Sequence, residues 1–374
     1  MRPEYKVWIE IKRSAVRANI RTFRVLLDKK TKLYAVVKSN AYGHGLLQFS
    51  SIADESGIDG FCVDSVIEGI KLRSHGITKP ILVLGYTLPG MYASAAKHDI
   101  TITISSKESL IAWHKAKEKP RFHIKIDTGM HRQGFQSSEV PGLLKKIQSA
   151  SRRTIRQPAD EIRNYLKGIY THFAMAKNRR DTAFTKEQYA LFESACALFE
   201  RVGFSDLMRH ASATGGALLG MPFHADMVRV GIGLYGIWPS AELERQLSKT
   251  ATLLPALSLH SVVSEVKTVA KGEGIGYDLT ERVKQATTIA IVPIGYWHGI
   301  PRAASSIGTV LVGKRKARII GRVSMDMLMI DVTGIPCRTG SEVMIMPADL
   351  AKEIDASPYE VVTRLNPLIH KAIT

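Results

Sequence analysis

Hydrophobic residues in the first two thirds of the chain form short runs, and several of the segments between them have helical spacing. The runs are apolar on both faces, as in parallel strands that are buried on both sides of a sheet. One helical segment begins with the capping pair Ser65 and Glu68 and can end at Gly76. The runs that predict strands are Leu33–Val37, Gly60–Val63, Pro80–Leu84, Ile100–Ile104, Phe122–Asp127, Leu166–His172, Met208–Ser212 and Met227–Ile232. Strands that alternate with helices in this way predict an α/β fold, a (β/α)8 TIM-like barrel.

The pattern changes after about residue 245, where alternating strands replace the helical spacing. The strands predicted there are Leu257–Val269, Thr288–Ile294, Thr309–Val312, Ala317–Val323, Leu328–Val332 and Glu342–Met346. We therefore expect residues 1–242 to form the barrel and residues 243–374 to form a C-terminal mostly-β domain. The first strand, at about residues 6–12 (Val7–Ile11), can pair with either domain.

The chain has 374 residues and a formal net charge of +18. Its basic residues are dispersed, with local bunching at Arg152-Arg153, Arg179-Arg180 and Lys314–Lys316, and no zinc or RNA-binding aromatic motif accompanies them. The long basic segment of residues 136–163 is expected to form a helix and a surface excursion. The charge therefore predicts a basic, solvated surface and no nucleic-acid site, although a positive field can gather anionic ligands.

The lengths of the apolar runs and the positions of the cysteines predict the cellular location. The N-terminus lacks the apolar run of a signal peptide, and no apolar stretch approaches the ~18 residues that a membrane span needs. Cys62, Cys196 and Cys337 are far apart and lack metal-ligand spacing, so they are expected to be free thiols in a reducing compartment. We expect a soluble, cytoplasmic protein without a metal site or a membrane partner.

One lysine stands at the end of a predicted strand. Leu33–Val37 delivers Lys38 to its C-terminal end, and a polar, glycine-rich turn follows. In a (β/α)8 barrel, chemistry takes place at the C-terminal ends of the strands. A lysine there can form a Schiff base with a carbonyl cofactor, although a single lysine after a strand is more often an ordinary surface residue. Arg132 follows another predicted strand and His172 is the last residue of one, so both are expected at the same mouth.

A glycine-rich string after the last barrel strand formally satisfies the pattern G-x-G-x-x-G. It spans residues 231–236, Gly-Ile-Gly-Leu-Tyr-Gly. A dinucleotide-binding fingerprint also requires a following helix and an acidic residue about 20 positions later. Trp238-Pro239 interrupts the helix here, so we reject a Rossmann fold.

The string around Lys38, residues 34–45 (YAVVKSNAYGHG), closely resembles the signature with which alanine racemases bind pyridoxal phosphate, PLP. The resemblance continues along nearly the whole chain, in the order of the family's blocks. The other blocks are residues 125–135 (KIDTGMHRQGF), 170–174 (YTHFA), 229–236 (RVGIGLYG), 274–277 (GIGY), 293–296 (PIGY) and 324–326 (SMD). Any one block alone is a weak signal, whereas the ordered set is specific.

The resemblance implies two bases. Lys38 matches the lysine that holds PLP and acts as one base, and Tyr277 matches the opposite base, which comes from the other subunit of a homodimer. Stereoinversion removes a proton on one face of Cα and returns one on the other, so two groups must flank the substrate. A phenol has an ordinary pKa of about 10 and is a poor base at neutral pH. The resemblance therefore makes His172 the partner of Tyr277.

Further roles follow from the same blocks. Arg229 matches the residue that faces the pyridine nitrogen, where a permanent cation keeps that nitrogen unprotonated and discourages side reactions such as transamination. Arg132 matches the residue that approaches the phenolic oxygen and the substrate carboxylate. Lys125 occupies a position that is carbamylated in many members. Substrate-binding and phosphate-binding positions complete the implied site: Met325, Tyr296 and Asp326 toward the substrate, and Tyr42, Thr214, Gly231 and Ile232 toward the phosphate.

The chain departs from the family pattern in three places. Trp297-His298 follows the tyrosine of the block at residues 293–296, where Ala-Asp is common. Ala213 precedes Thr214 where the family usually has Asn-Ser. The C-terminal segment of residues 365–374 lacks the tyrosine that many members place on the phosphate. These changes affect substrate preference and PLP affinity more than they affect the core reaction.

The resemblance implies a homodimeric PLP-dependent alanine racemase that supplies D-alanine for peptidoglycan. A broader racemase for serine or basic amino acids would share Lys38 and Tyr277, and Trp297-His298 keeps this alternative open. A barrel-type PLP decarboxylase is disfavoured because the β-domain lacks an evident match to that family's cysteine-bearing motif. A non-catalytic PLP carrier is the alternative from another class, and the β-domain that bears Tyr277 argues against it, since such carriers are typically barrels alone.

Overall fold

The computed structural model describes residues 4–149, 158–220 and 222–374. The chain divides into two compact units. We call Val16–Lys38 with Ser50–Leu254 the barrel unit, and Met1–Ala15, Ser39–Phe49 and Pro255–Thr374 the β unit.

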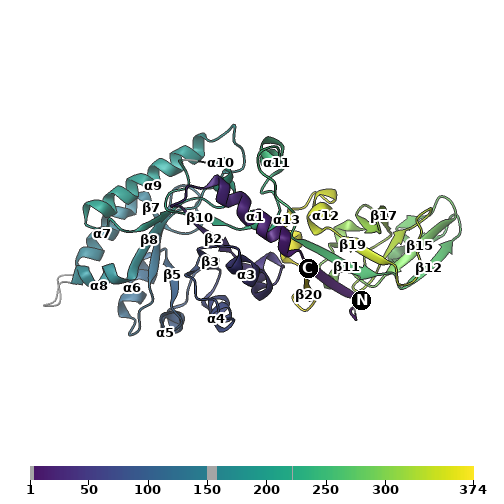
Figure 1. Ribbon diagram of the computed structural model, residues 1–374, viewed down its shortest axis with the longest axis horizontal. Helices are drawn as coiled ribbons and strands as arrows, with labels where there is room; N and C mark the ends of the chain where they lie inside the picture. The colour runs from purple at the N-terminus through teal and green to yellow at the C-terminus, as the bar shows by residue number, and fades with distance from the viewer. Residues whose placement is uncertain (1–3, 150–157, 221) are drawn as a thin grey trace. The chain divides into compact units, whose positions relative to one another are not determined.

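The barrel unit is built on parallel strands in the order β10-β2-β3-β4-β5-β6-β8-β9 (Figure 1). The strands are β2 (Lys32–Val36), β3 (Gly60–Val63), β4 (Ile81–Val83), β5 (Ile100–Ile104), β6 (Phe122–Asp127), β8 (Leu166–Tyr170), β9 (Met208–His210) and β10 (Met227–Val230), with β7 (Phe135–Gln136) paired to β6. Two backbone hydrogen bonds join the β9 and β10 segments, from Asp226 N–H to Arg209 O (3.1 Å) and from Arg229 N–H to Ser212 O (2.9 Å). The predicted barrel is therefore confirmed.

Helices lie outside the barrel strands (Figure 1). They are α1 (Arg13–Leu26), α3 (Leu46–Glu55), α4 (Val66–Ser74), α5 (Tyr92–Lys97), α6 (Lys107–Lys115), α7 (Val140–Ser149), α8 (Pro158–Tyr165), α9 (Ala183–Arg201), α10 (Thr214–Leu219) and α11 (Ala241–Leu247). Ser65 caps α4 by accepting from the N–H of Glu68 at 3.3 Å, as its sequence predicted. The predicted excursion falls partly on residues 150–157, which lie outside the described residues.

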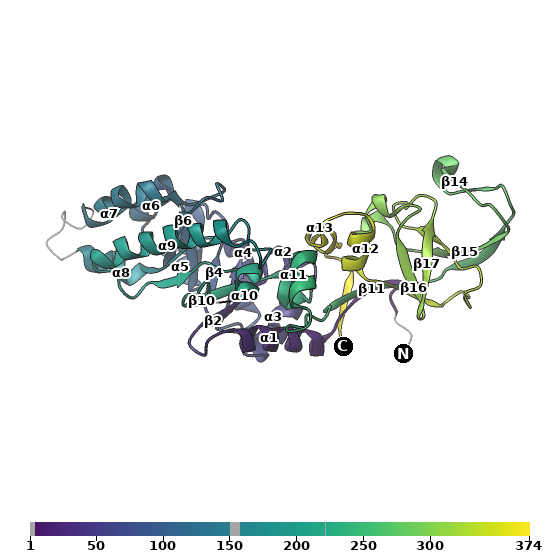
Figure 2. The same ribbon diagram turned by 90° about the horizontal axis from the view of Figure 1, so that it is seen from above.

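The β unit contains one large sheet in the order β12-β15-β18-β17-β16-β19-β11-β1-β20 (Figure 2). Its strands are β1 (Val7–Ile11), β11 (Leu257–Val262), β12 (Glu265–Val269), β15 (Thr287–Val292), β16 (Thr309–Val312), β17 (Arg315–Ile320), β18 (Leu328–Asp331), β19 (Glu342–Ile345) and β20 (His370–Ile373). The first strand, β1, pairs antiparallel with β11 and parallel with β20. The mostly-β character of this C-terminal part is confirmed.

Several elements of the β unit had no clear sequence signal. The run predicted as one strand over Leu257–Val269 is two strands, because Val263 and Ser264 bond to different partners, Ser341 O and Ile291 O. The strand β20 and the small pair β13 (Gly274–Ile275) and β14 (Glu281–Arg282) were not predicted. Neither were α12 (Pro347–Glu353) and α13 (Pro358–Thr363), which lie side by side in both views (Figures 1 and 2).

The turn that follows Lys38 has an unusual backbone. In α2 (Lys38–Tyr42), residues 39, 40, 41 and 42 have φ values of 55°, 56°, 50° and 52°. These values lie in the left-handed region of the backbone, which residues other than glycine rarely adopt. Asn40 stabilises the turn, since its Oδ1 accepts from Leu46 N–H at 2.9 Å. Gly43 is required in the same loop, because a Cβ there would lie 1.9 Å from the carbonyl oxygen of Val362.

Candidate active site

The mouth of the barrel gathers basic side chains from different strands. Lys38 follows β2, Lys125 lies in β6, Arg132 follows β6 and Arg229 lies in β10. All four act electrostatically on His172, which stands two residues after β8. The predicted residues of the barrel unit therefore face one site, as expected for the C-terminal edge of parallel strands.

Arg229 is a buried cation. Arg229 is only 1% exposed, and its Nη2 donates to the carbonyl oxygens of Thr171 (2.8 Å) and Ala211 (3.1 Å). The guanidinium also lies 5.0 Å from the ring centre of Tyr170. No carboxylate among the described residues forms an ion pair with it. Burial lowers its pKa from the ordinary value, yet an arginine keeps its charge in proteins.

A histidine pair behind Arg229 was not predicted. His210 Nδ1 contacts Arg229 Nη1, and its Nε2 lies 2.7 Å from His123 Nδ1. Burial, followed by the charge of Arg229, lowers the pKa of His210 well below its ordinary value and that of His123 to about 3. Both rings are therefore neutral at physiological pH. The available signal was a histidine inside each of two predicted strand runs, Phe122–Asp127 and Met208–Ser212.

His172 is neutral for the same reasons. Burial is the largest cause, and the neighbouring cations Arg229, Arg132, Lys125 and Lys38 add to it, so that its pKa lies well below 6.5. A neutral imidazole can accept a proton, whereas an imidazolium cannot. His172 is therefore a neutral hydrogen-bond partner at the mouth of the barrel.

Lys125 is buried in β6, at 4% exposure. Its Nζ donates to Gln133 O at 2.6 Å. Burial, then the charges of Arg132 and Arg229, lower its pKa from 10.5 to about 8. A substantial fraction of neutral amine is therefore present near neutral pH, and a neutral amine is the form that reacts with electrophiles such as CO2.

Lys38 has a carboxylate neighbour that the sequence interpretation missed. Its Nζ lies 3.3 Å from Asp64 Oδ1, and the two side chains are 37% and 54% exposed. Asp64 directly follows β3 (Gly60–Val63), and this acidic residue at a strand end next to β2 was the signal that was available.

The residues predicted to bind phosphate in the barrel unit lie close together. Thr214 Oγ1 accepts from the N–H groups of Gly231 (3.2 Å) and Gly233 (3.3 Å), which links α10 to the turn η4 (Ile232–Tyr235). Gly215 is required there, since a Cβ would lie 1.9 Å from Ala176 O. Backbone N–H groups and a hydroxyl thus converge on one place. Thr214, Gly231 and Ile232 lie together as predicted from their blocks.

The remaining predicted residues belong to the β unit. Tyr42 lies in the loop that follows Lys38, and its ring centre is 6.1 Å from that of Tyr359. Tyr277 begins the turn η5 (Tyr277–Leu279) and is 70% exposed. Its neighbour Asp278 forms an ion pair with Arg322 at 3.1 Å, which holds the turn.

Tyr296 and Met325 lie on adjoining loops of the β unit. Tyr296 N–H donates to Ser324 O and Trp297 N–H donates to Met325 O, both at 3.0 Å. The side chains of Tyr296 and Met325 are 46% and 54% exposed, and Asp326 beside them is also exposed. Three predicted substrate-binding residues are thus brought together on one surface of this unit.

The two departures at positions 297 and 298 have different environments. His298 is buried, and its Nδ1 accepts from Gly295 N–H at 3.1 Å. Trp297 is 57% exposed, and its carbonyl oxygen accepts from Asn366 Nδ2 at 3.1 Å. His298 therefore has a structural partner, and Trp297 is the departure that faces outward beside Tyr296.

The described residues contain no helix that is both long and apolar enough to span a membrane. Within the same ranges, no group of three or more His, Cys, Asp or Glu side chains is arranged to hold a metal ion. The cysteines are free thiols, with Cys62 and Cys196 buried.

Comparisons with known proteins cover nearly the whole chain. Residues 11–239 match the family model described as alanine racemase, N-terminal domain, and residues 256–373 match alanine racemase, C-terminal domain. The alanine racemase of Halothermothrix orenii is 35% identical over 369 residues, which cover 95% of this chain and 93% of that protein. Two solved structures each have a TM-score of 0.88 and 31% identity and cover 100% of this chain. They are alanine racemase from D-cycloserine-producing Streptomyces lavendulae (98% of that chain covered) and alanine racemase from Bacillus anthracis with bound L-Ala-P (96% covered). Together with the barrel, the C-terminal strands and the ordered motifs, these similarities show that the chain belongs to the alanine racemase family.

Proposed function

We propose that this protein is a PLP-dependent racemase that interconverts L- and D-alanine. The observation that carries the proposal is the set at the barrel mouth: Lys38 at the end of β2 shares one electrostatic environment with buried Arg229 and neutral His172. The Bacillus anthracis relative was solved with L-Ala-P, which supports alanine as the first substrate to test.

The residues present fit PLP. The Thr214 hydroxyl accepts from the N–H groups of Gly231 and Gly233, so its own hydrogen can be donated to a phosphate, with Gly231 and Ile232 beside it. Arg229 suits an unprotonated ring nitrogen because it is a cation held by backbone carbonyls. Lys38 offers the amine for covalent attachment. When bound, PLP supplies an electron sink that acidifies the α-carbon of an amino acid.

Two residues of the chain move the proton. Lys38 takes or returns the α-proton through Nζ on one face of the substrate, and Tyr277 does so through Oη on the other. We propose that Tyr277 comes from the second subunit of a homodimer, and its 70% exposure in the single chain supports this. His172 is the proposed hydrogen-bond partner of Tyr277, and its neutral ring can accept a hydrogen bond from the phenol.

Other residues bind and orient the substrate. Arg132 binds the substrate carboxylate, and we propose that Lys125 is carbamylated and orients Arg132, a reaction favoured by the lowered pKa of about 8. The Met325 N–H contacts the substrate, with Tyr296 and Asp326 beside it, and Tyr42 contacts the phosphate.

A broader substrate range is the second candidate function. It is favoured by one observation: Trp297, which replaces a commonly small residue, is 57% exposed beside Tyr296. An added indole near the substrate-binding surface changes the size that is accepted.

Chiral product analysis tests both candidates. Purified protein with PLP is incubated with L-alanine, L-serine or L-lysine, and the D-isomer is measured by chiral chromatography. We expect D-alanine as the main product and its loss in Lys38→Ala. Rapid formation of D-serine or D-lysine without D-alanine would support the broader racemase. α-Proton exchange in deuterated water separates both from a non-catalytic PLP carrier.

The biological setting is part of the same proposal. We propose a cytoplasmic homodimer that supplies D-alanine for peptidoglycan, with residues 1–242 as the PLP-binding part and residues 243–374 carrying the second base. The buried thiols of Cys62 and Cys196 are compatible with a reducing compartment. Rescue of a bacterium that requires added D-alanine is the direct test, with the Lys38→Ala protein as the control that should not rescue.

A further inference from the structure

Asp64 presents a carboxylate that none of the roles above uses. Its Oδ1 lies 3.3 Å from the Nζ of Lys38. The strands β2 and β3 pair in parallel with Val36 opposite Cys62. Lys38 and Asp64 each stand two positions beyond that pair, so strand register sets them side by side at the mouth of the barrel.

The position of Asp64 is fixed by its surroundings. Its backbone N–H donates to Glu68 Oε2 at 2.7 Å, which ties it to the first turn of α4. On the other side lies Gly85, where a Cβ would stand 2.3 Å from Asp64 O and 3.2 Å from Asp64 Oδ2. The absence of a side chain at Gly85 therefore leaves the room that this carboxylate occupies.

The Asp64 carboxylate forms its ion pair with Lys38. Four cationic side chains lie at the mouth: Lys38, Lys125, Arg132 and Arg229. Among the ion pairs formed by the described residues, the pair of Asp64 with Lys38 is the one that includes a member of this group. A second carboxylate at the mouth, Asp127, is engaged elsewhere, since its Oδ1 accepts from the N–H groups of Gly129, Met130 and His131 at 3.0, 3.0 and 3.1 Å.

We propose that Asp64 is a positioning residue for Lys38, holding its amine at the β2–β3 edge and stabilising the ammonium group that forms whenever this amine receives a proton. The proposal rests on the proposed function of Lys38 as base. Opposite charges at this separation attract, and because both side chains are partly exposed, water screens the attraction. The expected effects are therefore about 2–5-fold, the range of a partly exposed ion pair.

The first experiment measures amine reactivity and needs no catalysis. The full chain without PLP is treated with formaldehyde and cyanoborohydride, and methylation of each lysine is quantified by mass spectrometry. Asp64→Asn removes the charge at nearly constant shape, so methylation of Lys38 is expected to be about 2–5 times faster than in the parent. Unchanged Lys38 methylation in this variant would overturn the proposal.

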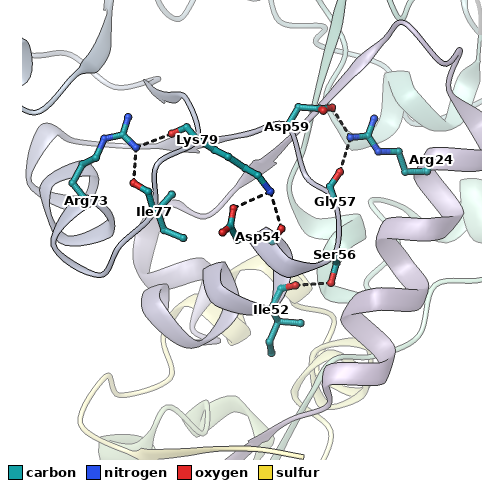
Figure 3. A network of polar contacts seen from close by, with 9 residues as sticks. All are labelled: Arg24, Ile52, Asp54, Ser56, Gly57, Asp59, Arg73, Ile77 and Lys79. Atoms are coloured by element: carbon teal, nitrogen blue, oxygen red, sulfur yellow. Dashed lines mark hydrogen bonds and ion pairs between the residues drawn. The ribbon is translucent and has the colours of Figure 1, made fainter.

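The chain offers a matched control pair in the same unit. Lys79 Nζ lies 2.9 Å from Asp54 Oδ1, with side chains 31% and 34% exposed, and it also donates to Asp54 O at 2.7 Å (Figure 3). Asp54→Asn should raise methylation of Lys79 and leave Lys38 unchanged, and Asp64→Asn should do the reverse. A rise at both lysines in Asp64→Asn would indicate general loosening of the fold and would count against a specific role.

The second experiment uses the PLP-loaded protein. PLP content is measured by absorbance near 420 nm, and kcat and KM for L-alanine are measured for the parent, Asp64→Asn and Asp64→Glu. We expect kcat to fall about 2–5-fold in Asp64→Asn with little change in KM, and to recover in Asp64→Glu. A kcat equal to that of the parent in a fully loaded Asp64→Asn protein would contradict the proposal. A parent protein that does not racemise alanine would contradict the proposed function, while the methylation experiment would still decide whether Asp64 holds Lys38.

Discussion

At the scale of single residues, burial beside cations produces neutral bases. His172, His210 and His123 all have pKa values lowered first by burial and then by neighbouring charge, Arg229 above all. Each imidazole therefore stays uncharged where a proton acceptor or a neutral hydrogen-bond partner is needed. Lys125 responds in the same way, because a charged amine is costly to bury.

Lys125→Met should stabilise the protein at neutral pH. The folded pKa of Lys125 is about 8, below the ordinary 10.5. Below pH 8 the charged amine must be buried on folding, whereas between pH 8 and 10.5 the unfolded chain binds the extra proton and the stability of the parent rises. In CO2-depleted buffer we expect the variant to be more stable by about 1–3 kcal/mol at pH 7, with a smaller difference at pH 10.

Urea unfolding at the two pH values measures this difference. A gap that is the same at pH 7 and pH 10 would contradict the lowered pKa. Added bicarbonate provides a control for carbamylation, since it should change the stability of the parent and not that of the Met variant.

At the scale of elements, short hydrogen-bonded links hold the predicted site residues. Thr214 joins the start of α10 to η4 through two N–H groups, and His298 closes the turn that carries Tyr296. Both are positions at which the chain departs from the family pattern or adjoins a departure. In this chain both side chains act as acceptors for backbone N–H groups, which fixes the local turn.

Thr214→Val should weaken both folding and PLP binding. Valine has the shape of threonine without the hydroxyl, so the buried N–H groups of Gly231 and Gly233 lose their acceptor. We expect a loss of about 1–3 kcal/mol in the free energy of unfolding, together with weaker PLP binding. Urea unfolding and PLP titration followed at 420 nm measure the two effects. Thr214→Ser keeps the hydroxyl and should resemble the parent.

His298 should make the β unit sensitive to acid. Burial lowers its pKa, with Asp326 raising it and Lys6 lowering it to smaller extents. As pH falls through the ordinary value near 6.5, the unfolded chain binds a proton that the folded chain resists, so stability declines. His298→Asn places an amide oxygen where Nδ1 accepts from Gly295, and it should remove this acid-dependent loss.

Unfolding curves at pH 7 and pH 5 test this expectation. His298→Leu, which has no acceptor, should be about 1–3 kcal/mol less stable than the parent at pH 7 because the Gly295 N–H is left unpaired, and the difference should be smaller at pH 5. Equal acid sensitivity in the parent and in His298→Asn would rule out His298 as the responsible group.

At the scale of the whole molecule, the two proposed bases belong to different compact units. Lys38 ends a segment of the barrel unit, and Tyr277 lies on the β unit with 70% of its surface exposed. A second copy of the chain would cover this exposed phenol and complete the site under the proposed function. Under the proposed function, racemase activity therefore requires the dimer.

Mixing two inactive variants should restore activity. Lys38→Ala and Tyr277→Phe each remove one base, and a mixed dimer contains one site with both bases intact if they come from opposite subunits. After co-expression in equal amounts, we expect about a quarter of the parent's racemase activity, since half of the dimers are mixed and each has one working site. Each variant alone should be nearly inactive. A mixture no more active than its components would place both bases in one subunit.

The hydrophobic pattern was sufficient to predict the barrel strands and the change to a mostly-β part, because a buried strand requires a short, local run of apolar residues that can be recognised in the sequence. The ordered motifs were sufficient to predict the family and to single out Lys38, since chemistry at strand ends depends on few positions. Only the tertiary structure revealed Asp64 beside Lys38, the histidine pair behind Arg229 and the neutral state of His172. These features depend on which strands become neighbours and on how much water the packed strands exclude. The residues involved are far apart in the chain, so no local sequence pattern indicates that they meet or that they are buried together. The strand β20 escaped prediction for the same reason, since its partner β1 lies at the other end of the chain.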